Sequence, residues 1–187
     1  MKTIILDSGH GGRDCGAVNS NLNVYEKSLN TLITDVVYNY LSNYECKIIK
    51  TKLSDTYLSL SERVNVANKN NADRFISIHC NSSTNKLAKG VECWVYNNDT
   101  NEKLGEDILH YISENRTNRG IKESKDFTVL KKTNCKSVIV ECGFISNIEE
   151  CKYIFNNINL IGEQISKGIV KNLKLKKKSK CFNCPYK

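Results

Sequence analysis

The sequence predicts a single-domain α/β fold whose sheet is mixed but mostly parallel and is covered by helices on both faces. Short apolar runs typical of strands recur along the chain, and segments with apolar residues three and four positions apart separate most of them. Strands that alternate with helices predict crossover connections and parallel pairing. The run at 90–96 follows its predecessor too closely for a helical crossover, so the sheet is expected to be mixed.

The expected elements follow from apolar periodicity and from the turn-forming residues between the apolar runs. The expected strands are residues 3–8, 46–51, 74–81, 90–96, 127–130 and 137–140. The expected helices are residues 25–44, 60–70, 101–115, 148–156 and 158–174. Residues 9–23 and 116–126 are glycine-bearing or polar and are expected to form loops.

The length and charge of the chain limit what it can be. Its 187 residues suffice for one domain with a substantial core and leave no room for a second. We expect a folded domain at residues 1–175 and a basic tail at residues 176–187. The net charge of +8 predicts anionic surroundings or substrates, and lysines near the C-terminus supply part of it. Whether the tail binds anions or only aids solubility is left open.

The cysteines do not indicate a disulfide framework. There are 9 of them, an odd number, and they are scattered. Cys80 and Cys142 each follow a candidate site residue on a strand, so they are expected to face the other side and pack as small core residues. Cys181 and Cys184 have metal-site spacing but lack a second ligand pair nearby, which favours a loose tail.

Four residues with metal-binding or proton-carrying side chains lie where a predicted strand ends or a helix begins. His10, His79 and Glu141 each follow an apolar run, and Glu26 lies in the first turn of a helix. The carboxyl ends of parallel strands meet at one edge of a sheet, so these side chains are expected to converge. Two histidines and a carboxylate form a three-ligand set for catalytic zinc, which leaves a fourth position for water.

Each of these residues alone has a simpler explanation. A single histidine after a strand is more often a structural hydrogen-bonding residue, and a glutamate in a first helical turn is favoured by the helix dipole. Glu141 is harder to explain in that way, because an acid that closes an apolar run is costly to desolvate without a partner or a function. His110 lies mid-helix and is expected to be a partly exposed surface residue.

The motifs around these residues are specific enough to indicate a family. They are Leu6-Asp7-Ser8-Gly9-His10-Gly11-Gly12, Glu26-Lys27, Leu60-Ser61-Glu62-Arg63, Ser77-Ile78-His79-Cys80-Asn81 and Val140-Glu141-Cys142-Gly143-Phe144-Ile145-Ser146-Asn147. In order, from about residue 3 to residue 173, they resemble the zinc-dependent N-acetylmuramoyl-L-alanine amidases of the amidase type 3 family. Ser8, Lys52 and Lys136 depart from residues that the family often has, but none of them is a ligand.

The resemblance implies one zinc ion held by His10, Glu26 and His79, with Glu141 as the catalytic carboxylate, and a mixed six-stranded sheet. The implied reaction cleaves the amide between the lactyl group of N-acetylmuramic acid and the L-alanine of peptidoglycan stem peptides, with zinc activating the water. Asn81, two residues past His79, is expected either to contact substrate or to cap the turn that ends its strand.

The expected partners are peptidoglycan and, through the basic tail, anionic wall polymers. Neither nucleic acid nor a membrane span is expected, since no apolar stretch reaches the ~20 residues that cross a bilayer. The fold begins with the first predicted strand rather than with a signal peptide. We therefore expect synthesis in the cytoplasm and action on the wall after phage lysis or mother-cell lysis, unless the sequence is a domain of a longer protein.

Two other functions remain open from the sequence. A zinc peptidase that cleaves within the stem peptide is possible because the same ligands serve any amide. A non-catalytic binder of polyanions predicts no bound zinc and salt-sensitive binding as its only activity. That second function leaves Glu141 unexplained.

Overall fold

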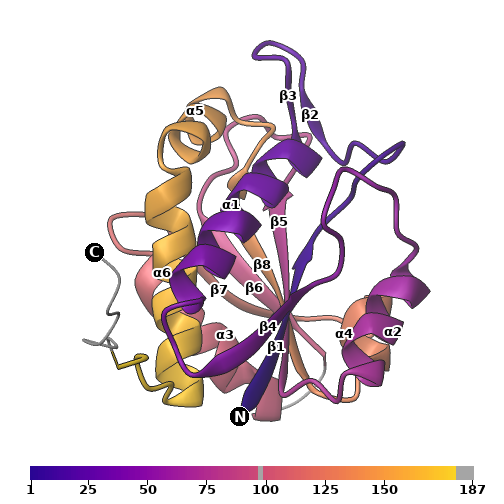
Figure 1. Cartoon of the computed structure of the whole chain (residues 1–187). Coiled ribbons are helices and arrows are strands. Elements are labelled where there is room, and N and C mark those ends of the chain that lie inside the picture. Colours follow the sequence, from indigo (N-terminus) through magenta and orange to yellow (C-terminus); the bar gives the residue numbers. More distant parts are fainter. Residues whose placement is uncertain (97–98, 180–187) are drawn as a thin grey trace, which may run out of the picture.

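A six-stranded sheet forms the centre of the computed structural model, which describes residues 1–96 and 99–179, with the side chains of residues 97–102 left aside (Figure 1). Its strands are β1 (Lys2–Ser8), β4 (Cys46–Lys50), β5 (Arg74–Asn81), β6 (Val91–Val95), β7 (Asn118–Glu123) and β8 (Lys136–Phe144), in the order β4-β1-β5-β8-β6-β7. Only the β6–β8 pair is antiparallel among these neighbours. The prediction of a mixed, mostly parallel sheet is therefore confirmed.

Helices cover both faces of the sheet. They are α1 (Glu26–Leu41), α2 (Leu60–Lys69), α3 (Asp99–Ile112), α4 (Thr128–Lys132), α5 (Ile148–Asn156) and α6 (Ile158–Leu173). Figure 1 shows α1, α3 and α6 on one side and α2 with α4 on the other. Two apolar clusters correspond to these faces, a large one that includes Ile33 and Ile165 and a smaller one around Phe75 and Val64.

Local sequence explains why the main elements form where they do. In α1, Leu29, Ile33, Val37 and Leu41 recur every four residues and are at most 1% exposed. Burial of each such side chain contributes about 1.5–3 kcal/mol. In α2, Ser59 and Glu62 form a capping box that fixes the start of the helix. The inner strands β1, β5 and β8 are buried over most of their length, because helices cover both of their faces.

Three expectations about local structure were wrong. Residues 116–126, expected to be a loop, contain β7, a polar edge strand that pairs only with β6 in the described sheet. Residues 127–130, expected to be a strand, lead into α4, because a short apolar run does not distinguish strand from helix and Val129 and Leu130 are buried beside α2. The expected loop at residues 9–23 contains most of a small hairpin of β2 (Val18–Asn19) and β3 (Val24–Tyr25).

The cysteines behave as predicted where they are described. The described cysteines are free, and Cys80 and Cys142 are 2% and 0% exposed within the larger core cluster. Cys181 and Cys184 lie outside the described residues, as does most of the predicted tail. The first part of that tail is hydrogen-bonded to the α1–β4 connection, since Glu45 N donates to Lys176 O (2.9 Å) and Lys178 N donates to Asn43 O (2.8 Å).

No helix in the described part of the chain combines the length and the apolar content that a membrane span requires.

Candidate functional site

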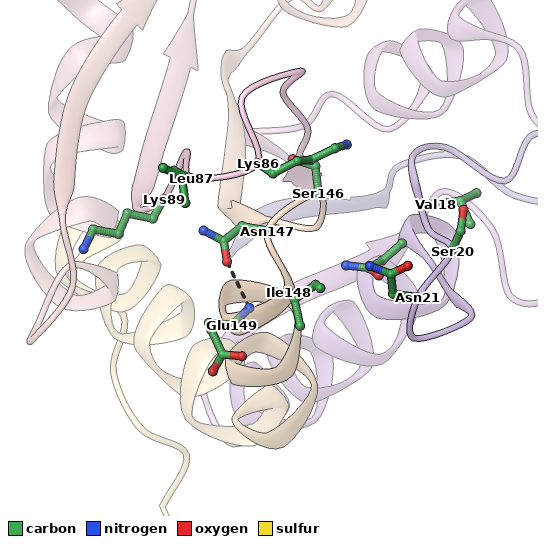
Figure 2. A pocket seen from close by; sticks show the side chains of 11 residues that line it. Val18, Ser20, Asn21, Lys86, Leu87, Lys89, Ser146, Asn147, Ile148 and Glu149 are labelled. Carbon is green, nitrogen blue, oxygen red and sulfur yellow. Dashed lines mark hydrogen bonds between the residues drawn. The ribbon is translucent and has the colours of Figure 1, made fainter.

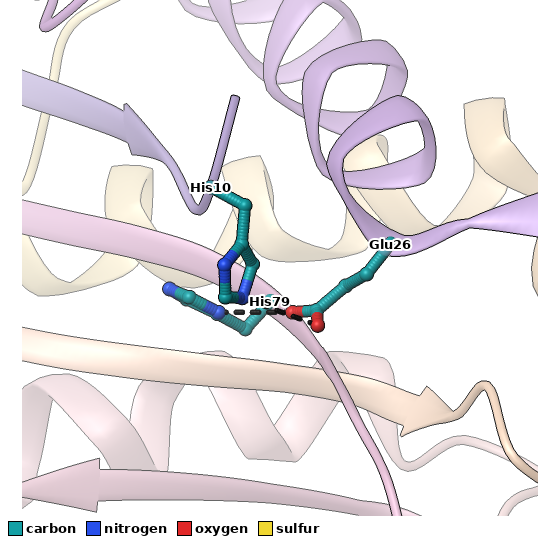
Figure 3. Close-up of side chains that lie close together, drawn as sticks. All are labelled: His10, Glu26 and His79. Atoms are coloured by element: carbon teal, nitrogen blue, oxygen red, sulfur yellow. Dashed lines mark hydrogen bonds and ion pairs between the residues drawn. The ribbon is translucent and has the colours of Figure 1, made fainter. Parts of the chain in front are cut away.

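The three predicted zinc ligands lie together at the carboxyl edge of the sheet. His10 follows β1, His79 belongs to β5, and Glu26 is the first residue of α1. One donor atom from each lies within 4.8 Å of the others (Figure 3). His10 Nε2 is 3.2 Å from Glu26 Oε2, and His79 Nδ1 is 3.0 Å from Glu26 Oε1. These three side chains therefore converge at one edge of the sheet, as expected from their positions at strand ends and a helix start.

Parallel pairing of β1 with β5 places the two histidines side by side. Ser8 pairs with Ile78 in register, and Gly9 N donates to Ile78 O at 3.0 Å. A side chain at Gly9 would collide with the imidazole of His79, so glycine is required where the two strands deliver their ligands. Gly16 has a φ of +66° and lies against the other two ligands, because a Cβ there would lie 2.6 Å from Glu26 Oε2.

The backbone of His10 has a left-handed conformation that its neighbours stabilise. Its φ is 63°, a strained value for a residue other than glycine. Its carbonyl oxygen accepts hydrogen bonds from Lys52 Nζ (2.6 Å) and Arg63 Nη2 (2.9 Å). Arg63 Nη1 also donates to Asp7 Oδ1 at 2.6 Å, and both of these side chains are almost fully buried. This buried network fixes the turn that presents the first ligand.

Asp14 holds the side chain of His10 from the opposite end of the ring. Its Oδ2 lies 2.9 Å from His10 Nδ1, and its Oδ1 accepts from Gly16 N at 3.1 Å. A proton on Nδ1 leaves Nε2, the nitrogen nearest Glu26, free to bind a metal. The sequence-based interpretation missed Asp14. The only signal was an acidic residue four positions after His10 in the glycine-bearing loop.

Charge interactions within the triad of His10, Glu26 and His79 oppose the effect of burial on the pKa values of these residues. Burial lowers the pKa of His10, but Glu26 and Asp14 outweigh it and raise the pKa to about 9. Burial likewise lowers the pKa of His79, and contacts with Glu26 and Glu141 raise it overall. Burial raises the pKa of Glu26, but hydrogen bonds to His10 and His79 hold it well below its ordinary value. The cluster therefore has an ionised carboxylate facing two imidazoles, and a metal ion that binds there displaces any proton from the ligating nitrogens.

Glu141 lies next to the triad on β8, where it pairs in register with His79 of β5. Its Oε2 is buried and has no hydrogen-bond partner among the described residues. Burial raises the pKa of Glu141 to about 7, with smaller contributions from Glu26 and Glu92 and with His79 opposing the shift. A buried carboxyl oxygen without a partner is costly, so its position is consistent with a chemical role.

Asn81 and His110 differ in how they relate to the site. Asn81 Nδ2 donates to Glu92 Oε1 and Asn81 Oδ1 accepts from Ser82 N, both at 2.8 Å. These bonds stabilise the end of β5, and a contact between Asn81 and substrate stays a prediction. His110 is exposed on α3 and does not belong to the triad, as expected.

Two depressions lie around the triad. A recess of about 360 Å³ contains His10, His79 and Glu141 and extends past Tyr57 and Phe127 towards α2 and α4. A more open groove of about 970 Å³ lies between the β2–β3 turn (residues 18–21), the loop 86–89 and the start of α5 (residues 146–149), as Figure 2 shows. Only the recess includes the candidate catalytic residues themselves.

Comparison with known proteins identifies the family. The family model Amidase_3, described as N-acetylmuramoyl-L-alanine amidase, matches residues 4–171. The chain is 33% identical to the endolysin of Bacillus phage SPP1 over 95% of this chain and 68% of the endolysin. It is 34% identical to the N-acetylmuramoyl-L-alanine amidase LytC of Bacillus subtilis over 80% of this chain and 30% of LytC. The chain thus corresponds to less than a third of LytC.

A solved structure supports the same relationship. The catalytic domain of CwlV, an N-acetylmuramoyl-L-alanine amidase from Bacillus (Paenibacillus) polymyxa var. colistinus, superimposes with a TM-score of 0.88 at 31% identity and covers 94% of this chain and 100% of that domain. The matched range includes His10, Glu26, His79 and Glu141. With the sequence motifs, the fold and the family model in agreement, the chain belongs to the Amidase_3 family of N-acetylmuramoyl-L-alanine amidases.

Proposed function

We propose that this chain hydrolyses the amide between N-acetylmuramic acid and the L-alanine of the stem peptide in bacterial peptidoglycan, with one zinc ion held by His10, Glu26 and His79. The observation that carries the proposal is the juxtaposition of two imidazoles and a carboxylate with the buried, unpartnered carboxyl oxygen of Glu141. Family membership supports the choice of this amide over others.

The donor set fits zinc. His10 Nε2, His79 Nδ1 and the Glu26 carboxylate supply two nitrogen ligands and one oxygen ligand, a set typical of catalytic zinc with an open fourth position. Asp14 on the far side of His10 is the kind of second partner that such ligands have. A bound zinc ion supplies a Lewis acid that polarises a carbonyl oxygen and makes water more acidic.

The residues of the chain account for the proton transfers. Glu141 lies beside His79 and is the nearest carboxylate with a free buried oxygen, so we assign it to take a proton from the attacking water and to give one to the leaving nitrogen of L-alanine. A pKa near 7 suits a group that both accepts and donates a proton at neutral pH. Arg63 and Lys52 hold the backbone of His10, and Asp14 holds its ring.

We place the activity on the bacterial cell wall, because the proposed substrate is peptidoglycan and because a relative that is 34% identical, LytH of Staphylococcus epidermidis, is named a probable cell wall amidase. The basic C-terminal segment is proposed to bind anionic wall polymers, on the strength of its lysines at 176, 177, 178 and 180.

Metal analysis and digestion of purified wall with wild type and Glu141→Gln test this function. The variant should retain zinc and lose about 10²–10⁴-fold in hydrolysis, the usual contribution of a general acid or base. New L-alanine amino termini on an intact glycan support the amidase. New termini within the stem peptide would instead identify a peptidase, and full activity of the variant would exclude the role of Glu141.

A further inference from the structure

The groove beside the triad has a chemistry that the proposed reaction does not yet use. The inference below rests on the proposed function. The substrate amide has two unlike arms, a sugar on one side and a peptide on the other, and the structure has two unlike depressions at the same edge of the sheet. The recess borders α2 and α4, whereas the groove borders the β2–β3 hairpin and α5 (Figures 1 and 2).

Both walls of the groove connect directly to the triad. On one wall Val18 pairs with Tyr25, the residue before Glu26, and Ala17 N donates to Glu26 Oε2 at 2.9 Å. On the other wall Ile145 N donates to Asn81 O at 2.8 Å, two residues past His79. The segments that form the two walls of the groove are therefore hydrogen-bonded to Glu26 and to the end of the strand that carries His79.

The loop that carries the lysines of the groove is tied to the body of the protein. Ser83 N donates to Ser146 Oγ at 2.9 Å, and Asn147 Nδ2 donates to Ala88 O at 3.2 Å. Figure 2 shows Lys86 extending towards the side of the groove where Val18, Ser20 and Asn21 lie, whereas Lys89 extends away from them. Lys86 therefore presents its ammonium group at the rim of the groove. Lys89 is exposed on the same anchored loop and reaches the groove by rotation of its side chain.

The charges of the groove suit an anionic peptide. No ion-pair partner is found for Lys86 or Lys89 in the described part of the chain. The acid of the groove, Glu149, is already paired with Lys152 at 3.0 Å. The apolar surface of the groove is formed in part by the aliphatic side chains of Leu87 and Ile148, which are 82% and 37% exposed. Such a surface matches alanine methyl groups beside peptide carboxylates.

The recess has the opposite character. Tyr57 and Phe127 expose 43% and 38% of their surface, and the recess also contains the carboxylates of Asp14 and Asp126. Carboxylates repel the acidic groups of a stem peptide but accept hydrogen bonds from sugar hydroxyls. Aromatic side chains offer broad apolar contact to the C–H faces of a sugar ring. The recess therefore fits the sugar arm better than the peptide arm.

We propose that the groove formed by residues 18–21, 86–89 and 146–149 binds the stem peptide, with Lys86 and Lys89 pairing with its carboxylates, and that the recess holds the muramic acid. The groove thereby distinguishes stem peptides by the charge of their second residue. A glutamate with a free α-carboxylate binds more tightly than its amidated form.

The test is a binding cycle with released stem tetrapeptides whose second residue has either a free α-carboxylate or an amide. Wild type, the double variant K86Q/K89Q and the charge-matched control K47Q/K167Q are titrated by calorimetry at low and high salt. Lys47 and Lys167 are exposed on β4 and α6, away from the groove. Wild type and control should prefer the carboxylate peptide by about fivefold, as expected for exposed ion pairs, and the preference should vanish in K86Q/K89Q and at high salt.

The outcomes separate the groove from the reaction. An undiminished preference in K86Q/K89Q, or an equal loss in the control, would overturn the assignment of the groove whether or not the protein hydrolyses wall. Peptide binding that depends on the two lysines in a protein that cleaves no muramyl amide would retain the groove and reject the proposed function.

Discussion

Removal of the Asp14 carboxylate should weaken zinc binding without unfolding the protein. In the structure Asp14 Oδ2 lies 2.9 Å from His10 Nδ1, and the Asp14 side chain keeps 45% of its surface exposed, so truncation leaves neither a large cavity nor a buried unpaired charge. Loss of such a partner typically reduces metal affinity by about 10–100-fold, which corresponds to about 1.4–2.7 kcal/mol.

Competition with a chromophoric chelator measures this effect on Asp14→Ala, with urea denaturation of the zinc-free protein as a check on folding. Asp14→Asn should lose less affinity, because its amide oxygen still accepts from the Nδ1 proton of His10. Asp35→Ala is the matched control, since Asp35 is also a partly exposed aspartate with one charged partner, Lys50, at 2.9 Å. A zinc dissociation constant of Asp14→Ala within about twofold of wild type would refute the argument that this carboxylate orients the ligand.

Three further predictions concern stability. Arg63→Met should destabilise the protein by about 3–5 kcal/mol in urea denaturation, because it leaves Asp7 buried without its cation; a loss below about 1 kcal/mol would contradict this. Gly16→Ala should cost more than Gly120→Ala and should also weaken zinc binding, because both glycines have positive φ (66° and 80°) but only Gly16 has neighbours at its Cβ position; equal costs would contradict the contact argument. In the zinc-free protein, the pKa of Glu141 is raised from an ordinary 4.5 to about 7, so its ionisation favours the unfolded state as pH rises through this interval. Glu141→Gln should therefore gain stability relative to wild type over the same interval, by up to about 3 kcal/mol. A difference in stability that does not change with pH would refute this.

The predicted strands that lead to the candidate site agree with the structure better than the predicted elements near the edge of the sheet. His10, His79 and Glu141 follow apolar runs that became the inner strands β1, β5 and β8, and inner parallel strands are apolar on both faces. Edge elements lack that signal. The polar strand β7 and the short helix α4 are both specified by what they pack against, which local periodicity does not contain.

The sequence by itself determined the kinds of side chains available for chemistry and the edge of the sheet at which they meet. It could do so because the carboxyl ends of the strands in a parallel sheet share one edge. Only the tertiary structure decided how the residues are held. Asp14 contacts the ring of His10, and Arg63 and Lys52 donate hydrogen bonds to its carbonyl oxygen. The buried Glu141 Oε2, in turn, has no hydrogen-bond partner among the described residues. Such contacts depend on distances of a few ångströms, which spacing along a chain does not encode.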